Sequence, residues 1–218
     1  MTAHLYLQRD VHAVAVADDI VVLNITSDSY QCLPGGSADL AIGRNGAITA
    51  PEPLADALMA AGLAQTEPPF GRRNDPPPLP TRVVAPDAIP QPPRVRDLAT
   101  LALCLLDLQI HYRGRSFAHI LASVRQSRPR HRGDESADAL TLAVKQFRRA
   151  AIWLPAPRKC LMRSFVLLRF LQRSGLDADW VIAVRTWPFA AHCWLQAGDV
   201  VLDEVPDRAL AFRPIAVA

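Results

Sequence analysis

The sequence predicts an α+β protein in two parts. Helix-forming segments fill the middle of the chain and strand-forming segments follow them, an order typical of α+β proteins. Ten of the 19 prolines fall between Pro68 and Pro93, and this density disfavours both helices and central strands. With 218 residues, half of them hydrophobic, the chain is long enough for a small and a medium domain. We therefore expect a small module over 1–67, a proline-rich linker over 68–94 and a larger domain over 95–218.

The first part begins with strand signals. Two runs rich in β-branched residues, 11–17 and 20–26, are separated by Asp18-Asp19, which suits a two-residue hairpin turn. A third short run covers Tyr30–Leu33. These runs predict a small three-stranded sheet.

A short helix is expected after this sheet, because Pro51 and Pro53 stand where a helix can start and Gly62 can end it. Its apolar face would carry Leu54, Ala57, Leu58 and Ala61. The first part holds no cluster of catalytic residue types. We expect it to be a binding module rather than an enzyme.

The second part starts with helices and ends with strands. The expected helices, each with its capping residue, are Leu98–Ile110 after Asp97, Phe117–Val124 after Ser116, and Ala137–Ala151 after Ser136. A fourth helix is expected to start at Cys160, behind Pro155 and Pro157, and to end at Gly175. The expected strands are 180–184, 191–197 and 200–204.

Composition and motifs argue against several classes of function. The net charge of +3 is mild and the arginines at 125–132 fit a solvated surface loop, so no nucleic-acid partner is expected. No glycine-rich phosphate-binding motif occurs, so we expect this chain to bind no cofactor. The longest apolar run, Leu98–Leu106, is too short to span a membrane, and the N-terminus shows no signal-peptide pattern.

The cysteines are few and widely spaced. They are Cys32, Cys104, Cys160 and Cys193, without any C-x-x-C pair. That spacing predicts neither a disulfide framework nor a metal site. Together with the lack of a secretion signal, it makes the reduced cytoplasm the expected location.

Cys160 stands out because it opens a helix. The first turn of a helix offers unpaired N–H groups and a positive dipole end, which favour a thiolate over a thiol. Three basic residues add positive charge nearby: Arg158, Lys159 and Arg163. His192 and Asp203 follow on the expected strands. A thiol, an imidazole and a carboxylate are the parts of a cysteine nucleophile with its base and orienting acid.

The choice of carboxylate depends on the turn between the last two strands. If Gly198-Asp199 is a two-residue hairpin loop, Asp203 shares a face with His192 and Glu204 lies on the opposite face. A four-residue loop keeps this parity, whereas a three-residue loop exchanges Asp203 for Glu204. We favour Asp203. Cys193 alternates away from His192 and is expected in the core.

The C-terminal third resembles the transglutaminase-like (papain-like) cysteine peptidases that remove leader peptides during lasso-peptide maturation, the B proteins of those pathways. The residues that carry the resemblance are Ala151-Ile152-Trp153-Leu154-Pro155, Cys160-Leu161-Met162-Arg163-Ser164, Gly175 and Pro188-Phe189-Ala190-Ala191-His192-Cys193-Trp194. In that family the residue after the histidine is commonly Ala, so Cys193 is a small departure. The first part resembles the winged-helix-like leader-recognition domain of such systems, by a weaker motif.

The resemblance implies a leader-recognition module fused to a peptidase. A ribosomally made precursor peptide would add its leader as an extra strand along the module. The expected peptide-binding residues are Tyr30, Cys32, Leu33, Leu54 and Leu58. Cys160, His192 and Asp203 would then hydrolyse the leader–core bond. The freed core would pass to an ATP-dependent ring-closing synthetase, and any ATP requirement would reside in that partner.

Two other functions fit the same residues. The first is transfer of the acyl group to an amine, as in transglutaminases proper, instead of transfer to water. The second is a non-catalytic peptide-binding scaffold in which Cys160 is buried and unreactive.

Overall fold

The computed structural model describes residues 1–71, 73–87, 91–129, 137–154, 157 and 159–218. They form two compact units. Unit 1 contains Met1–Pro76, Ile182–Ala191 and Phe212–Val217, and unit 2 contains Pro77–Val181, His192–Ala211 and Ala218. These units are spatial groupings, so the division into 1–67, 68–94 and 95–218 stays a prediction about domains.

Unit 1 contains the predicted three-stranded antiparallel sheet. Its strands are β2 (Val11–Val16), β3 (Asp19–Asn24) and β4 (Ser29–Leu33), in the order β2-β3-β4. Val16 pairs with Asp19, so the two-residue turn is Ala17-Asp18, one residue before the predicted Asp18-Asp19. Ala17 takes a positive φ of 52°, as the first position of such a turn requires.

A second sheet in unit 1 was not predicted from the sequence. It has the order β5-β6-β1-β7, and its strands are β1 (Thr2–Leu7), β5 (Ala41–Ile42), β6 (Ala47–Pro51) and β7 (Ala64–Gln65). Two 3-10 turns, Gly36–Ala38 and Arg44–Gly46, join these segments. The predicted short helix is α1 (Glu52–Ala60), and Gly62 follows it with φ +67°. Because strands dominate residues 1–71, the expected winged-helix-like character is not confirmed.

The hydrophobic core of unit 1 consists of side chains from both sheets and from α1. It includes Leu5, Leu7, Ile20, Val22, Ile48 and Leu58. Leu58 is 4% exposed, so it packs inside the module and does not offer a surface to a peptide. The expectation that Leu58 binds the leader is therefore wrong. Leu54 is partly buried against the same core.

The proline-rich segment is attached to both units. The Arg73 guanidinium donates hydrogen bonds to the carbonyls of Leu7, Gln8 and Val11. Further along, β8 (Arg82–Val83) pairs in parallel with β11 (Val200–Val201). These contacts fix parts of the segment that was expected to be a linker, and a free linker over 68–94 is not confirmed.

The helices of unit 2 match the predicted ones closely. They are α2 (Val95–His111), α3 (Phe117–Gln126), α4 (Ala137–Ala151), α5 (Cys160–Arg173) and the unpredicted α6 (Pro206–Leu210). Ser116 caps α3 by accepting the His119 backbone N–H, as predicted. Asp97 lies within the first turn of α2 instead of before it. The expected cap Ser136 lies outside the described residues, as do Pro155 and Arg158.

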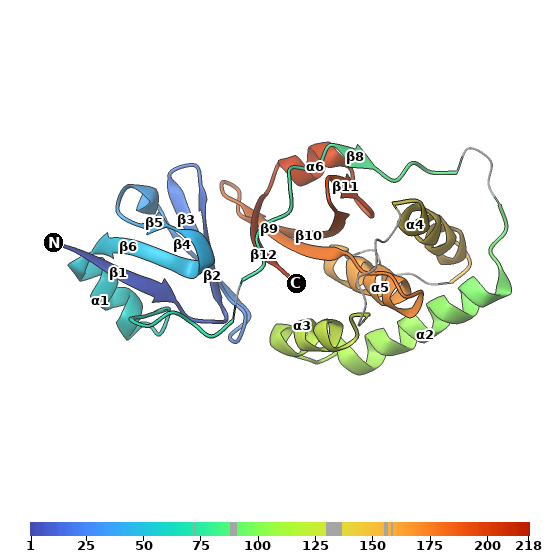
Figure 1. The fold of residues 1–218 in the computed structure, drawn as a ribbon, viewed down its shortest axis with the longest axis horizontal. Coiled ribbons are helices and arrows are strands. Elements are labelled where there is room, and N and C mark those ends of the chain that lie inside the picture. The colour runs from blue at the N-terminus through green and yellow to red at the C-terminus, as the bar shows by residue number, and fades with distance from the viewer. Residues whose placement is uncertain (72, 88–90, 130–136, 155–156, 158) are drawn as a thin grey trace. The chain divides into compact units, whose positions relative to one another are not determined.

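Helix α5 is the central helix of unit 2 and packs against α2 and α4 (Figure 1). Every residue from Ser164 to Gln172 is buried. Asp107 of α2 holds its C-terminal half, because this buried carboxylate accepts hydrogen bonds from Arg169 and Arg173. The opposite, N-terminal end of the helix carries Cys160. A well-packed helix therefore fixes the position of the candidate nucleophile.

A five-stranded sheet completes the fold. Its order is β12-β9-β10-β11-β8, with β9 (Asp179–Arg185), β10 (Ala190–Ala197) and β12 (Arg213–Val217). Ala197 pairs with Val200, which confirms the predicted two-residue turn at Gly198-Asp199. Strand β11 is shorter than the expected 200–204 and ends at Val201.

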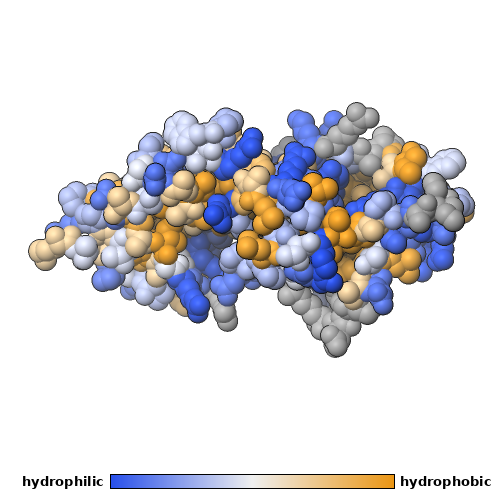
Figure 2. All heavy atoms as spheres, turned by 90° about the horizontal axis from the view of Figure 1, so that it is seen from above, coloured by the Kyte–Doolittle hydropathy of each residue, from blue (hydrophilic) through white to orange (hydrophobic). Residues whose placement is uncertain are grey.

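The surface mixes polar and apolar side chains. Figure 2 shows hydrophobic residues reaching the surface in separate groups among hydrophilic ones. Among the described residues, no helix is both long and apolar enough to cross a membrane.

Candidate active site

Cys160 is the first residue of α5 and is partly exposed. Lys159 precedes it in extended conformation, and no side chain caps this helix end. The first helical hydrogen bond runs from the Arg163 N–H to the Lys159 carbonyl. The N–H groups of the preceding first turn therefore have no partner within the helix, and they give the sulfur a positive electrostatic environment.

His192 lies between a sulfur and a carboxylate. It projects from β10 and is 5% exposed. Its Nε2 is 2.7 Å from the Glu204 Oε2. The same ring hydrogen-bonds to the side chain of Cys160. Because Glu204 occupies Nε2, the hydrogen bond to Cys160 falls to Nδ1. The three groups form a thiol–imidazole–carboxylate chain.

The carboxylate in this chain is Glu204 and not the predicted Asp203. The Asp203 Oδ1 accepts the backbone N–H of Leu195 at 2.8 Å, and its Oδ2 lies 3.8 Å from the Arg163 Nε. The prediction that Asp203 orients His192 does not match this geometry. The structure brings Cys160 and His192 together, as predicted. The carboxylate that contacts His192 is Glu204, the residue after Asp203.

The exchange has a local cause, because the strand ladder ends before Asp203. Leu202 still donates its N–H to the Leu195 carbonyl, but the Leu202 carbonyl accepts the Arg148 guanidinium instead of the Leu195 N–H. The Asp203 side chain replaces that carbonyl as the acceptor for Leu195. The alternation of side chains therefore stops at Leu202, and the next carboxylate along, Glu204, reaches the histidine.

These contacts favour an ion pair between Cys160 and His192. Hydrogen bonds from Cys193 and from His192 lower the pKa of Cys160 to about 4, against the opposing effect of burial. The hydrogen bond to Cys160 raises the pKa of His192, burial opposes this, and the bond to Glu204 adds to it. The two shifts together favour a thiolate paired with an imidazolium, the reactive form of a cysteine nucleophile.

The two carboxyl groups titrate in opposite directions. Burial raises the pKa of Asp203 to about 6, although the Leu195 N–H and the charge of Arg163 oppose it. Burial also works to raise the pKa of Glu204, but the Val205 N–H, His192 and Arg208 outweigh it and the pKa falls. Glu204 is thus the carboxylate that stays charged beside the imidazolium.

A buried hydrogen-bond network lies behind the nucleophile. The Trp180 indole N–H donates to the Ser164 Oγ at 2.9 Å, and this hydroxyl donates to the Cys160 carbonyl at 2.7 Å. The Cys193 sulfur lies 3.4 Å from the same Ser164 Oγ. Cys193 is 2% exposed, as expected for a core residue, but its thiol also hydrogen-bonds to the Cys160 sulfur. Strict strand alternation did not predict this contact.

A pocket of about 710 Å³ lies on the Arg163 side of α5. Its lining residues are Phe147, Arg148, Ala151, Ile152, Pro157, Arg163, Leu167, Leu202 and Asp203. Its lining area is largely apolar, with charged groups from two arginines and one aspartate. A pocket of this kind accepts an apolar side chain and a polar backbone together.

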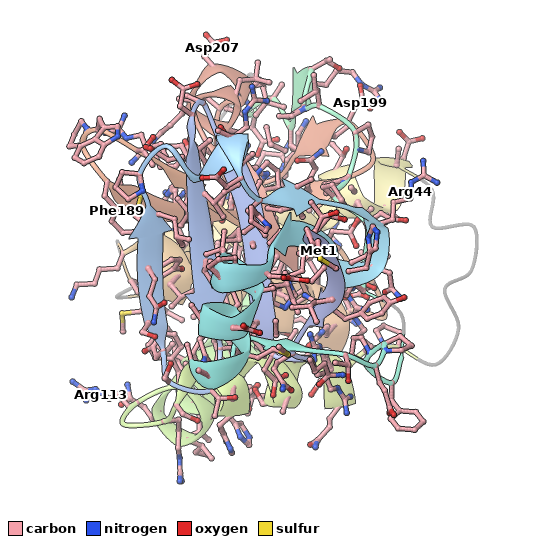
Figure 3. All side chains as sticks on the ribbon, turned by 90° about the vertical axis from the view of Figure 1, so that its left-hand side faces the viewer. Met1, Arg44, Arg113, Phe189, Asp199 and Asp207 are labelled. Carbon is pink, nitrogen blue, oxygen red and sulfur yellow. The ribbon has the colours of Figure 1, made fainter. Side chains whose placement is uncertain are left out.

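The expected peptide-binding residues lie in unit 1. Cys32 is exposed, and Tyr30 and Leu33 are partly buried on the outer strand β4. The Tyr30 ring contacts the Phe189 ring at a centroid distance of 5.5 Å, and Figure 3 labels Phe189 beside this sheet. A largely apolar pocket of about 400 Å³ lies there, lined by Tyr30, Gln31, Cys32, Thr186, Trp187 and Phe189. Trp187 is anchored by its indole N–H, which donates to Asp19.

Among the described residues, no group of three or more His, Cys, Asp and Glu side chains is arranged to hold a metal ion.

The chain belongs to the transglutaminase-like superfamily, whose family model matches residues 102–217, more than half of its length. The match includes Cys160, His192 and Glu204. The chain is also similar to the microcin J25-processing protein McjB of Escherichia coli, with 42% identity over 48 residues. That segment is 22% of this chain and 23% of McjB, so the chain spans about a quarter of that relative. No solved structure was found to match.

Proposed function

We propose that this protein is a cysteine peptidase that hydrolyses the leader–core bond of a ribosomally made precursor peptide during lasso-peptide biosynthesis. One observation carries the proposal: a cysteine at a helix start hydrogen-bonds to a histidine whose other nitrogen is held by a buried glutamate. Membership in the transglutaminase-like superfamily supports this chemistry. The similarity to a microcin-processing protein supports a precursor peptide as the substrate.

In the proposed mechanism, the Cys160 thiolate attacks the carbonyl carbon of the scissile bond. The tetrahedral oxyanion accepts the Cys160 backbone N–H at the start of α5, where no helical partner competes for it. The His192 imidazolium then gives its proton to the leaving amine of the core. A thioester to the leader remains on Cys160. His192, now neutral, activates the water that resolves it.

Glu204 is proposed as the residue that orients His192. Its carboxylate holds Nε2 at 2.7 Å, so Nδ1 faces the sulfur. Its side chain is only 8% exposed, and Arg163 and Arg208 lie 3.8 and 3.6 Å from its Oε2. These arginines help to keep the carboxylate ionised without taking its place on the histidine. Glu204 therefore stabilises the imidazolium in each step in which His192 carries the extra proton, and it keeps the ring oriented when His192 is neutral.

We propose that unit 1 holds the leader. Strand β4 is an outer strand of its sheet, and the pocket beside it is lined by Tyr30, Cys32, Trp187 and Phe189. An extended leader pairing along Tyr30–Leu33 would satisfy the backbone of the outer strand and place an apolar side chain in that pocket. Leu33 and Leu54 would border the leader, whereas Leu58 belongs to the core. Holding the leader raises the effective concentration of the cleavage site near Cys160.

The proposed partner downstream is an ATP-dependent ring-closing synthetase that receives the freed core. Hydrolysis through a thioester needs no nucleotide. An ATP requirement for the complete pathway is therefore assigned to the synthetase.

The test is a Cys160→Ala variant incubated with full-length precursor peptide. We expect the leader to bind normally while cleavage falls below detection, because Cys160 is the partly exposed thiol of the site, whereas the neighbouring Cys193 is buried. Cys104→Ala is the matched control, since Cys104 is a buried cysteine on α2 away from the site. Binding is measured by fluorescence anisotropy of a labelled leader and cleavage by mass spectrometry. Normal cleavage by Cys160→Ala would contradict the proposal.

Acyl transfer to an amine is a second candidate, favoured by the superfamily to which the chain belongs. It would use the same thioester and differ only in the acceptor. The mass of the leader product separates the two, because hydrolysis leaves a carboxylate and transfer leaves an amide adduct.

A further inference from the structure

The candidate nucleophile has a second thiol in direct contact. Cys193, on β10, hydrogen-bonds to Cys160 through both its side chain and its backbone N–H. Ser164 joins them from a third side, because its Oγ donates to the Cys160 carbonyl and lies 3.4 Å from the Cys193 sulfur. The two cysteines therefore lie side by side around Ser164, with the second thiol as a direct neighbour of the candidate nucleophile.

Hydrolysis does not require this second thiol. In the proposed mechanism the base is His192 and the orienting acid is Glu204, so Cys193 has no bond to make or break. The two thiols also differ in access. Cys160 is partly exposed, whereas Cys193 is 2% exposed. An oxidant from solvent therefore reaches Cys160 first, and the buried thiol can only act second.

We propose that a hydroperoxide converts Cys160 and Cys193 into a reversible disulfide. The Cys160 thiolate attacks one peroxide oxygen, the O–O bond breaks, and the released oxyanion takes the proton of His192 to leave as an alcohol or water. Cys160 is then a sulfenic acid. The Cys193 sulfur attacks it, the S–O bond breaks, and the leaving hydroxide takes the Cys193 proton as water. Two thiols are oxidised by two electrons and one peroxide is reduced.

The electrostatics fit this order of events. The hydrogen bond to Cys160, burial and the negative charge of Cys160 all raise the pKa of Cys193, so Cys193 is a protonated thiol while Cys160 is a thiolate. Once Cys160 is a neutral sulfenic acid, its negative charge no longer raises the pKa of Cys193, whereas burial still does. Ser164, which lowers the pKa of Cys193, remains. Oxidation of the first sulfur therefore removes one of the causes that keep Cys193 protonated.

The consequence is protection of the nucleophile. A sulfenic acid without a nearby thiol goes on to sulfinic acid, which thiols do not reduce. With Cys193 in contact, the oxidised site stops at a disulfide that an ordinary thiol reductant reopens. The proposal rests on Cys160 being a thiolate, which the proposed function shares, and does not rest on the identity of the peptide substrate.

The test treats the reduced full chain with hydrogen peroxide and follows it by intact mass and non-reducing peptide mapping. We expect the loss of two hydrogen atoms, a Cys160–Cys193 linked peptide and full recovery of iodoacetamide labelling after dithiothreitol. In Cys193→Ala, Cys160 should gain two oxygens, and the labelling recovered by dithiothreitol should fall at least about tenfold. Cys193→Ser, the closest replacement in size, repeats the test if Cys193→Ala unfolds. Cys104→Ala, which changes a buried cysteine on α2 outside the site, should behave as the wild type.

Two results would overturn the inference: oxidised Cys160 with Cys193 still a free thiol, or equal recovery of Cys160 in wild type and Cys193→Ala. Iodoacetamide labelling before oxidation keeps this failure separate from failure of the proposed function. Rapid labelling of Cys160 with no disulfide would contradict only the present inference. Absence of labelling would contradict the thiolate itself, and both proposals with it.

Discussion

The adjacent residues Asp203 and Glu204 have different hydrogen-bond partners because the regular strand pairing ends at Leu202, just before them. Asp203 completes the sheet by accepting the Leu195 N–H, and Glu204 holds His192. Neither role follows from acidity alone. Each role follows from the hydrogen-bond donor that is available to the side chain. Because the Leu202 carbonyl accepts from Arg148, the Leu195 N–H is left to Asp203.

Replacing each carboxylate with its amide should separate these roles. Glu204→Gln removes the charge that stabilises the imidazolium, and we expect the cleavage rate to fall on the order of 100-fold. Asp203→Asn keeps an oxygen for the Leu195 N–H, so its cleavage rate should stay within about threefold of wild type. The rates are measured side by side at neutral pH. Equal damage by the two substitutions would contradict this assignment.

Asp203→Asn should also change the pH dependence of stability. The pKa of Asp203 is raised to about 6 in the folded protein, so its ionisation costs folding free energy that grows as pH rises from about 4 to 6. Below that window the carboxyl is protonated in both states and the cost is absent. The variant should therefore be more stable than wild type at pH 7, by on the order of 2 kcal/mol, and no more stable at pH 4. Urea unfolding at both pH values measures this, and a loss of stability at pH 7 would contradict it.

The pH dependence of Cys160 alkylation tests the ion pair. A pKa lowered to about 4 means that the thiolate forms as pH rises through that value, so the labelling rate should be nearly flat across neutral pH. His192→Ala removes one of the three hydrogen bonds that lower the pKa of Cys160, and its labelling curve should move to higher pH. Iodoacetamide rates between about pH 4 and pH 9 provide the measurement. A wild-type rate that climbs steadily to pH 9 would argue against a thiolate at neutral pH.

At the scale of elements, helix α5 and strands β9 and β10 position the site together. The N-terminal end of α5 is joined to the sheet through Ser164, which accepts from Trp180 of β9 and contacts Cys193 of β10. Trp180 is fully buried, so its indole N–H has no access to water. One hydroxyl therefore couples the position of the nucleophile to the strand that carries the histidine.

Ser164→Ala should destabilise the protein because it leaves the Trp180 N–H buried without an acceptor. We expect a loss of about 1–3 kcal/mol in the free energy of unfolding. Ser174→Ala is the matched control: Ser174 makes the same type of bond to the carbonyl four residues back, at the partly buried C-terminal end of α5. That change should cost less than about 0.5 kcal/mol. Equal losses of unfolding free energy for Ser164→Ala and Ser174→Ala, measured by denaturant titration, would contradict this role of Ser164 as the acceptor for Trp180.

Local patterns predict the helices and the candidate nucleophile at a helix start, whereas long-range contacts determine the rest. The Ser116 cap, the start of α5 at Cys160 and the turn at Gly198-Asp199 depend on neighbours in sequence, and they were predictable. Strand β1 pairs with β6, more than 40 residues away in the sequence, and no local sequence pattern predicts that pairing. Leu58 is in the core for the same reason, since strands of the unpredicted sheet cover it.

The site shows the same division. Cys160 and His192 were found from residue type and order. Regular alternation beyond Leu202 would place Glu204 on the face away from His192, but Arg148 of α4 interrupts the ladder at the Leu202 carbonyl. A short strand followed by Pro206 was the available signal that the alternation would stop, because proline favours a break in pairing.

At the scale of the whole molecule, the two units divide the proposed work. Unit 1 carries the outer strand β4 and an apolar pocket suited to a peptide, and unit 2 carries Cys160, His192 and Glu204. The substrate we propose is a peptide long enough to use both, bound by its leader and cut beyond it. A short peptide that lacks the leader should therefore be a poor substrate even if it contains the scissile bond.

The most direct test of the central claim is mass spectrometry of full-length precursor cleaved in ¹⁸O-enriched water. We expect the wild type to cleave a single bond, with the heavy oxygen in the new carboxylate of the leader and none in the core, and we expect no cleavage by Cys160→Ala. An amide adduct on the leader, or cleavage that survives the loss of Cys160, would contradict the claim.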